Sequence, residues 1–140
     1  MPFWILPHTA DVRLRVEASS VAELFAEAMR GMMEIVLPGF CTQTFPHCRL
    51  VEQDVRVQSV DQSALLIDFL SEVLYWSQVQ HAVFCAVRFQ QLDKVSLQAR
   101  IEGCEVEQAF EEDIKAVTYH ESFIRQNPSG RWETVVVFDI

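Results

Sequence analysis

Residues 11–36 read DVRLRVEASSVAELFAEAMRGMMEIV, a strand pattern followed by a helix pattern. Every second residue from 12 to 16 is apolar, and this period of two predicts a strand with one buried face. Ser20 precedes Glu23 by three residues, which is the spacing of a capping box. Apolar residues then recur at helical spacing to about Val36, before a Pro-Gly pair. This stretch therefore predicts a sheet covered by an amphipathic helix.

The same patterns extend over the rest of the chain. Asp61 is placed to cap a second helix, and an Asn-Pro-Ser-Gly cluster at 127–130 predicts a hairpin turn. Two segments lack a regular pattern, namely 41–53 and the acidic stretch 103–113. The remaining predicted strands are a short one at 55–57 and longer ones at 82–89, 95–101, 114–124 and 132–139. The order β-α-β-α-β-β-β-β predicts one α+β domain spanning 1–140, with two layers, an antiparallel or mixed sheet and two main helices.

Charge and hydropathy limit the classes of partner. The formal net charge is −9 for 140 residues, so we expect no direct binding of the polyanionic nucleic acids. No apolar run approaches the roughly 18 residues that span a bilayer, so no membrane partner is expected and the predicted location is cytoplasmic. In that compartment the four cysteines are expected to be reduced thiols.

Carboxylates at the two ends of the chain form the first candidate site. Asp11 opens a predicted strand, and Asp139 ends another one next to Ile140, whose terminal carboxylate is expected to add charge. Clustered carboxylates repel one another unless a proton or cation intervenes, and a hard divalent ion suits an all-oxygen site. From the residues alone, two unrelated surface aspartates remain the alternative.

Other chemistry-bearing residues have weaker patterns. Asp68 and Glu72 are four apart and share a helix face, which suits either acid–base work or ordinary solvation. The cysteines at 41 and 48 lack the second close pair of a structural zinc site. No phosphate-binding glycine loop or hydrolase motif is present, so the motifs do not indicate an enzyme.

Four segments are informative in combination, namely HTADV at 8–12, LIDFLSEVLY at 66–75, IKAVTYH at 114–120 and VVFDI at 136–140. Together they resemble the archease family over nearly the whole chain. The resemblance implies an α+β fold and a role as activator of RtcB-type RNA ligases, which join RNA ends in tRNA splicing or RNA repair. Such a protein promotes guanylylation of the ligase and its repeated turnover.

The resemblance also implies roles for individual residues. Asp11 and Asp139 match the metal-binding aspartates of the family, and Ile140 matches the residue that supplies a backbone oxygen. The implied cofactor is a divalent ion, with Ca²⁺ favoured and Mn²⁺ or Mg²⁺ as alternatives. His8 and Lys115 match motif positions that are expected to face the partner ligase.

Some positions depart from the family pattern. Pro7 replaces a frequent acidic residue, Arg13 stands where a small residue is common, and the loop 103–113 lacks the usual family sequence. Arg13 shares a strand face with Asp11, so its guanidinium can compete with a cation for that carboxylate.

Three hypotheses follow. The first is a metal-binding accessory protein that activates an RNA ligase. The second is a small metal-dependent phosphoester hydrolase that uses Asp11 and Asp139, with Asp68 or Glu72 as an optional further carboxylate. The third is a chaperone-like interaction module that needs no metal.

Overall fold

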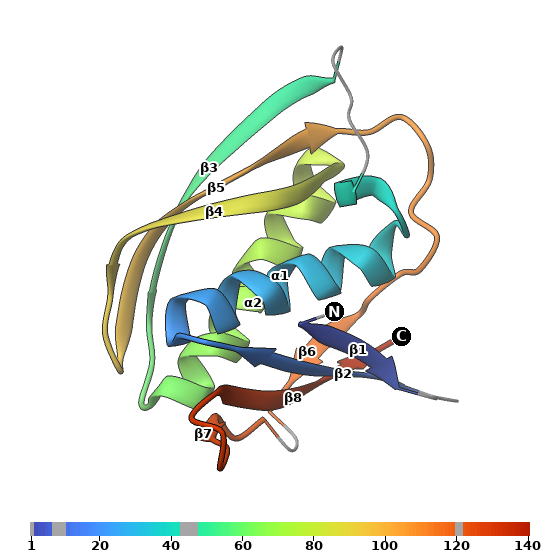
Figure 1. The fold of residues 1–140 in the computed structure, drawn as a ribbon. Coiled ribbons are helices and arrows are strands. Elements are labelled where there is room, and N and C mark those ends of the chain that lie inside the picture. Colours follow the sequence, from blue (N-terminus) through green and yellow to red (C-terminus); the bar gives the residue numbers. More distant parts are fainter. Residues whose placement is uncertain (1, 7–10, 43–47, 120–121) are drawn as a thin grey trace.

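The computed structural model describes residues 2–6, 11–42, 48–119 and 122–140. Eight strands, two long helices and one short 3-10 helix make up this part of the chain (Figure 1). The elements are β1 (Phe3–Leu6), β2 (Asp11–Ala18), α1 (Val21–Val36), η1 (Phe40–Thr42), β3 (Arg49–Gln58), α2 (Gln62–Gln80), β4 (Ala82–Leu92), β5 (Ser96–Glu105), β6 (Ala116–Thr118), β7 (Arg125–Gln126) and β8 (Trp132–Asp139).

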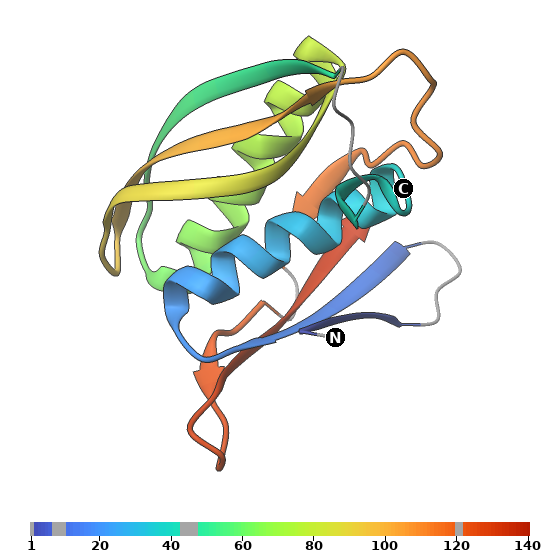
Figure 2. The ribbon, with the colours of Figure 1, turned by 45° about the horizontal axis from the view of Figure 1, so that its top comes forward.

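The strands form two separate antiparallel sheets. The larger sheet has the order β1-β2-β8-β6, with β7 pairing with β8, and the smaller has the order β3-β5-β4. Both helices pack between the sheets: α1 contacts β2 on one side and β4 on the other, while α2 contacts β3, β4 and β6 (Figures 1 and 2). The predicted α+β class with two main helices is confirmed. The helices form a middle layer, so the fold has one layer more than the two predicted.

Both helices begin where the sequence predicts. The Ser20 side chain accepts from the Glu23 backbone N–H at 3.1 Å, and Asp61 accepts from the Ala64 N–H at 2.8 Å. Each cap satisfies a donor that the first helical turn leaves without an intrahelical partner. At the end of α2, His81 adopts the left-handed conformation, with φ 49°.

Large apolar side chains fill the space between the two sheets. A single cluster of buried residues includes members of both helices and of both sheets. Phe25 from α1 and Phe69 from α2 are fully buried, with ring centroids 5.9 Å apart, and both contact Phe89 of β4. This core fixes the relative position of the sheets. None of the helices in the described ranges is both long enough and apolar enough to cross a membrane.

The observed elements differ from the predicted ones in several places. Residues 49–53, predicted to be irregular, begin β3, whose ten residues all pair with β5. Residues 103–105, also predicted to be irregular, form the end of β5. Within the predicted strand 114–124 only β6 is observed, and β7 begins directly after residue 124. The apolar residues at 3–6 form an additional strand that pairs with β2.

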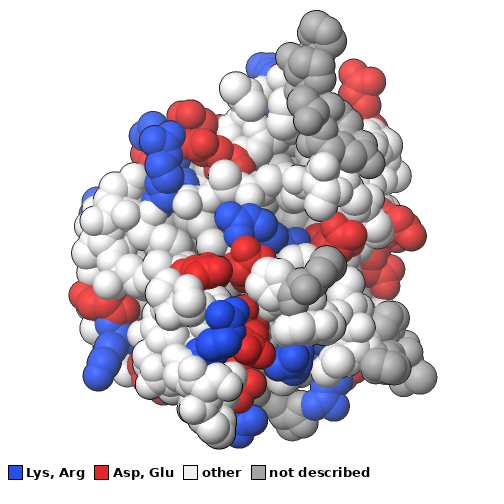
Figure 3. Space-filling model, in the orientation of Figure 1, with Lys and Arg blue, Asp and Glu red and all other residues white. Residues whose placement is uncertain are grey.

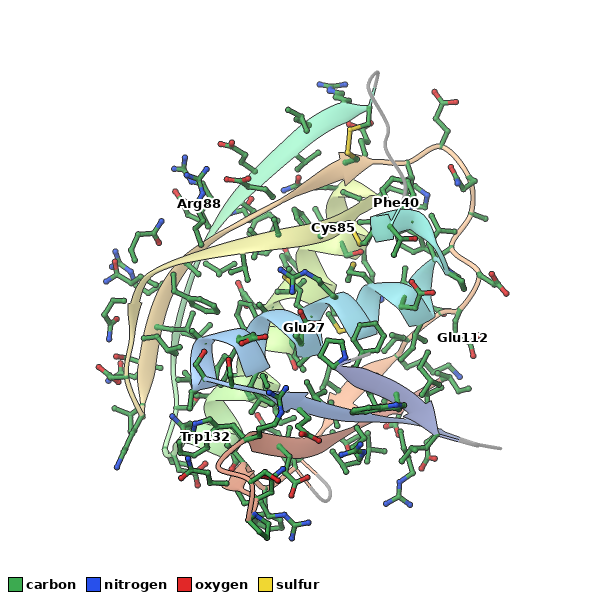
Figure 4. The ribbon with its side chains drawn as sticks, viewed as in Figure 1. Glu27, Phe40, Cys85, Arg88, Glu112 and Trp132 are labelled. Atoms are coloured by element: carbon green, nitrogen blue, oxygen red, sulfur yellow. A yellow bond between two sulfur atoms is a disulfide. The ribbon has the colours of Figure 1, made fainter. Side chains whose placement is uncertain are left out.

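The expectation of reduced cysteines is wrong in this structure. Cys41 beside α1 is bonded to Cys85 on β4, and Cys48 before β3 is bonded to Cys104 on β5 (Figure 4). The Cα atoms of the two pairs lie 5.4 and 5.6 Å apart, within the usual range for a disulfide. The expectation rested on the inferred compartment, whereas the fold brings residues 44 and 56 positions apart into bonding distance.

Candidate metal centre

Three strands of the larger sheet meet at the candidate site. Asp11 is the first residue of β2 and Asp139 the last of β8, and the two are directly opposite in the antiparallel register. On the other side of β8, Asp139 pairs with Ala116, the first residue of β6. The Lys115 backbone N–H also donates to the Asp139 carbonyl oxygen at 2.8 Å. The fold therefore joins three of the four segments noted in the sequence at one end of the sheet.

The side chains of Asp11 and Asp139 lie on the same solvent-facing side of the sheet. Along β2, Val12 and its alternate neighbours are buried against the helices, whereas Asp11 is only partly covered. Along β8, Phe138 is fully buried and Asp139 is exposed. Directly opposite residues of an antiparallel pair have Cβ atoms about 5 Å apart. The strand register thus places two carboxylates side by side.

This arrangement fits a hard cation. Like charges directly opposite each other destabilise a sheet, and a divalent ion between them replaces repulsion by attraction. Two carboxylates are also the oxygen donors that Ca²⁺ and Mg²⁺ prefer. Ile140 follows Asp139 directly and packs its side chain against the core, which fixes the backbone at the end of β8.

The described residues provide only part of a coordination shell. Among them, no group of three or more His, Cys, Asp or Glu side chains is placed to hold a metal. Because Ca²⁺ takes six to eight oxygen ligands, backbone oxygens and water would have to complete the shell around this pair. His8, one of the two residues predicted to face a partner, lies outside the described residues.

Arg13 shares the outer face of β2 with Asp11, two residues away, and it pairs in register with Val137 of β8. A guanidinium that reached the aspartates would weaken their repulsion and lower the benefit of a bound cation. The competition expected from the sequence stays a prediction.

Strand β6 is held against α2 by hydrogen bonds at both of its ends. Gln78, near the end of α2, donates from Nε2 to the Ile114 carbonyl at 3.1 Å. Near the start of α2, Asp68 accepts hydrogen bonds from the Tyr119 hydroxyl and from Ser59 Oγ. The strand thus runs antiparallel to the helix, and this support fixes the position of the strand that pairs with Asp139. The hydrogen bond to Asp68, together with burial, raises the pKa of Tyr119.

The hydrogen bonds of Asp68 and Glu72 indicate structural roles for both residues. Asp68 anchors Tyr119, and Glu72 accepts a hydrogen bond from the Trp76 indole at 3.3 Å on the same helix. Both lie on α2, on the helix-covered side of the sheet, whereas Asp11 and Asp139 project from the opposite side. The structure therefore does not bring either residue to the aspartate pair, so neither can serve as the optional further carboxylate of the hydrolase hypothesis.

Lys115 immediately precedes β6, and its side chain is exposed. Its backbone is tied to Asp139, so the lysine stands beside the aspartate pair at the end of the sheet. Sequence reasoning missed the roles of Gln78, Ser59 and Tyr119. Of these, Tyr119 alone carried a signal, because it belongs to the segment 114–120 that contributes to the resemblance.

Comparison with known proteins identifies the family of this chain. The model of the Archease protein family (MTH1598/TM1083) matches residues 3–140. The archease of Methanosarcina mazei is 30% identical over 142 residues, which cover 96% of this chain and 93% of that protein. The archease of Pyrococcus furiosus is 30% identical over 139 residues, covering 95% and 94%.

Two solved structures share the fold. The solution structure of Methanobacterium thermoautotrophicum protein 1598 has a TM-score of 0.76 at 23% identity and covers 99% of both chains. The crystal structure of a Thermotoga maritima protein, described as an archease and possible chaperone, has a TM-score of 0.68 at 18% identity and covers 96% of this chain and 94% of its own. On the family match and the 30% identities over nearly full length, this chain belongs to the archease family.

Proposed function

We propose that this protein is a metal-binding accessory protein that activates an RtcB-type RNA ligase. The observation that carries the proposal is the direct pairing of Asp11 with Asp139 on an exposed side of the sheet. Like charges directly opposite each other are unfavourable for the sheet alone, and this supports a cation as their counter-charge. Family membership supplies the class of partner.

The proposed cofactor is Ca²⁺, with Mn²⁺ or Mg²⁺ as alternatives. Asp11 and Asp139 would hold the ion through their carboxylates, and Ile140 through a backbone oxygen. A bound divalent ion supplies concentrated positive charge at the surface of an otherwise acidic protein. The chain's own residues position that charge: β6 and α2 keep the end of β8 in place, and Lys115 stands next to it, facing the ligase.

The outer face of the larger sheet, toward the end opposite the site, supports a protein partner rather than direct RNA binding. Arg15 of β2 and Arg131 of the β7–β8 turn are paired with glutamates: Arg15 lies 3.2 Å from Glu17 and 3.7 Å from Glu133, and Arg131 lies 2.7 Å from Glu17. Figure 3 shows blue and red side chains interleaved over this part of the molecule. No continuous basic patch of the kind that tracks a phosphate backbone forms on these strands.

An assay of ligase activity tests the proposal. The wild-type protein is expected to stimulate guanylylation and multiple turnover of the RtcB-type ligase from the same source, in the presence of GTP and a divalent metal. The variants Asp11→Asn and Asp139→Asn should lose the stimulation, while the control Asp113→Asn, which removes an exposed carboxylate from the preceding loop, should retain it. Full stimulation by both site variants would refute the metal mechanism.

A metal-independent, chaperone-like role is the second candidate. The description of the Thermotoga maritima structure as a possible chaperone favours it. It predicts that Asp11→Asn stimulates or stabilises a partner as well as the wild type does. The ligase proposal includes a cytoplasmic location. The two disulfides are an observation against that location, since such bonds are rare in the cytosol of mesophiles.

A further inference from the structure

A cleft opens at the same end of the molecule as the aspartate pair. It has a volume of about 310 Å³ and lies between the edge of the larger sheet, the C-terminal turn of α1 and the loop before β6. Its apolar walls come from Ile5 on β1, Val12 on β2, and Ile35 and Pro38 at the end of α1. Ile5 is 44% exposed, which leaves apolar surface available to a ligand.

Three carboxylates complete the cleft. Glu34 is fixed in place, because both of its carboxylate oxygens accept from the Gly39 backbone N–H at 3.1 Å. Glu111 and Glu112 are held by their own backbone N–H groups, which donate to the Val36 carbonyl at 2.8 and 3.4 Å. Figure 4 shows Glu112 beside the end of α1, above β1.

The local electrostatics favour a cation. The C-terminal end of a helix carries a partial negative charge, and the last turn of α1 has no basic residue to offset it. No lysine or arginine is among the described residues that line the cleft. Figure 3 shows acidic side chains gathered over this end of α1 and the neighbouring loop.

A basic side chain fits this combination better than a metal ion does. These three glutamates do not form a group of three side chains placed to hold a metal ion. Lysine and arginine carry an alkyl stem that covers apolar surface and a charged head that stays hydrated or paired. The apolar walls would contact the stem and the carboxylates would face the head.

The cleft opens at the same end of the larger sheet as the candidate metal centre, but on the helix-covered side of the sheet. Val12, which lines it, directly follows Asp11 on β2, and the loop that carries Glu112 leads within three residues to Lys115 and its hydrogen bond to Asp139. Both ribbon views place the C-terminus near the end of α1 (Figures 1 and 2). A partner that wraps around this end of the sheet would contact both the aspartate pair and the cleft.

We propose that this cleft binds a lysine or arginine side chain of the partner ligase and so docks the ligase against the aspartate pair. The inference rests on the proposed function and adds to it a second, separable site. The aspartate pair supplies the activating charge, and the cleft contributes to affinity.

The test measures binding and stimulation separately. Fluorescence anisotropy gives the Kd of the labelled protein for the ligase, and guanylylation at saturating protein gives the stimulation. The double variant Glu111→Gln/Glu112→Gln should bind about tenfold more weakly, since it removes two charges from a partly desolvated pairing, yet stimulate fully at saturation. Ile5→Ser should also weaken binding through the apolar wall. The affinity of the wild type should fall more steeply than that of the double variant between about 50 and 300 mM salt.

The control matches the change in net charge. The pair Glu23→Gln/Glu107→Gln also removes two carboxylates, one at the opposite end of α1 and one in the loop before β6, and neither lines the cleft. Equal loss of affinity in both double variants would mean that only net charge matters and would overturn the inference. Wild-type affinity for the ligase in Glu111→Gln/Glu112→Gln would overturn the inference too. So would a dimer of the wild type in sedimentation equilibrium that Glu111→Gln/Glu112→Gln abolishes, because the cleft would then bind a second copy of this chain. If the wild type neither binds nor stimulates the ligase, the proposed function itself fails.

Discussion

The two disulfides should supply a large part of the stability of this protein. The Cys41–Cys85 bond closes a loop of 44 residues, and the Cys48–Cys104 bond one of 56. By the entropy of loop closure in the unfolded chain, each bond alone contributes about 4 kcal/mol. The loops overlap, so with the first bond in place the path from Cys48 to Cys104 shrinks to about 26 residues and the second bond adds about 3.5 kcal/mol.

The sum of about 7.5 kcal/mol is comparable to the entire unfolding free energy of a typical domain. Denaturant unfolding, followed by tryptophan fluorescence with and without reductant, measures this contribution of the disulfides to the unfolding free energy. The paired variants Cys41→Ser/Cys85→Ser and Cys48→Ser/Cys104→Ser should each lose about half of the effect, and reductant should remove the remainder. Four reactive thiols in the protein as purified, or an unchanged unfolding midpoint after verified reduction, would refute the reasoning.

Two further predictions concern single residues. A methyl group added at Gly103 would lie 2.0 Å from the Val83 carbonyl oxygen of the neighbouring strand, so Gly103→Ala should cost about 3 kcal/mol or more in denaturant unfolding; a cost below about 1 kcal/mol would contradict the close approach. The raised pKa of Tyr119 means that the folded state holds the phenol proton more tightly, because of the hydrogen bond to Asp68. This contribution to stability is complete below the unfolded pKa of about 10 and is lost as the pH rises through the folded value. Unfolding free energies measured across that range should fall less in Tyr119→Phe than in the wild type, and identical pH profiles would exclude this role of the hydrogen bond.

Local patterns were sufficient to predict both helices and the strand at 11–18. Ser20 and Asp61 cap their helices through their own side chains, so the signal lies within four residues of each helix start. The alternation in β2 is equally local, because one side of the strand faces the core and the other faces solvent.

The strand predicted at 114–124 failed for a tertiary reason. Its residues favour strands, but α2 captures the segment after Thr118: Tyr119 bonds to Asp68, and the Ile124 N–H donates to Ser63 Oγ at 3.0 Å. These partners lie more than 50 positions away, beyond the reach of any periodicity. The cysteine pairing was likewise not predictable, since four cysteines allow three connectivities.

The candidate site was predicted by resemblance rather than by chemistry. Asp11 and Asp139 are 128 positions apart, and nothing in their local sequence indicates that β2 and β8 are neighbours. Once the register is known, the pairing follows directly. The acidic cleft could not be predicted at all, because its lining comes from four separate segments.

The most direct test of the central claim is a calorimetric titration of the purified protein with Ca²⁺. We expect one binding event in the wild type and in the control Asp113→Asn. Both Asp11→Asn and Asp139→Asn should lose it while remaining folded by circular dichroism. Binding of Ca²⁺, Mn²⁺ or Mg²⁺ that is unaffected by either substitution, or no binding of any of these ions to the wild type, would contradict the central claim.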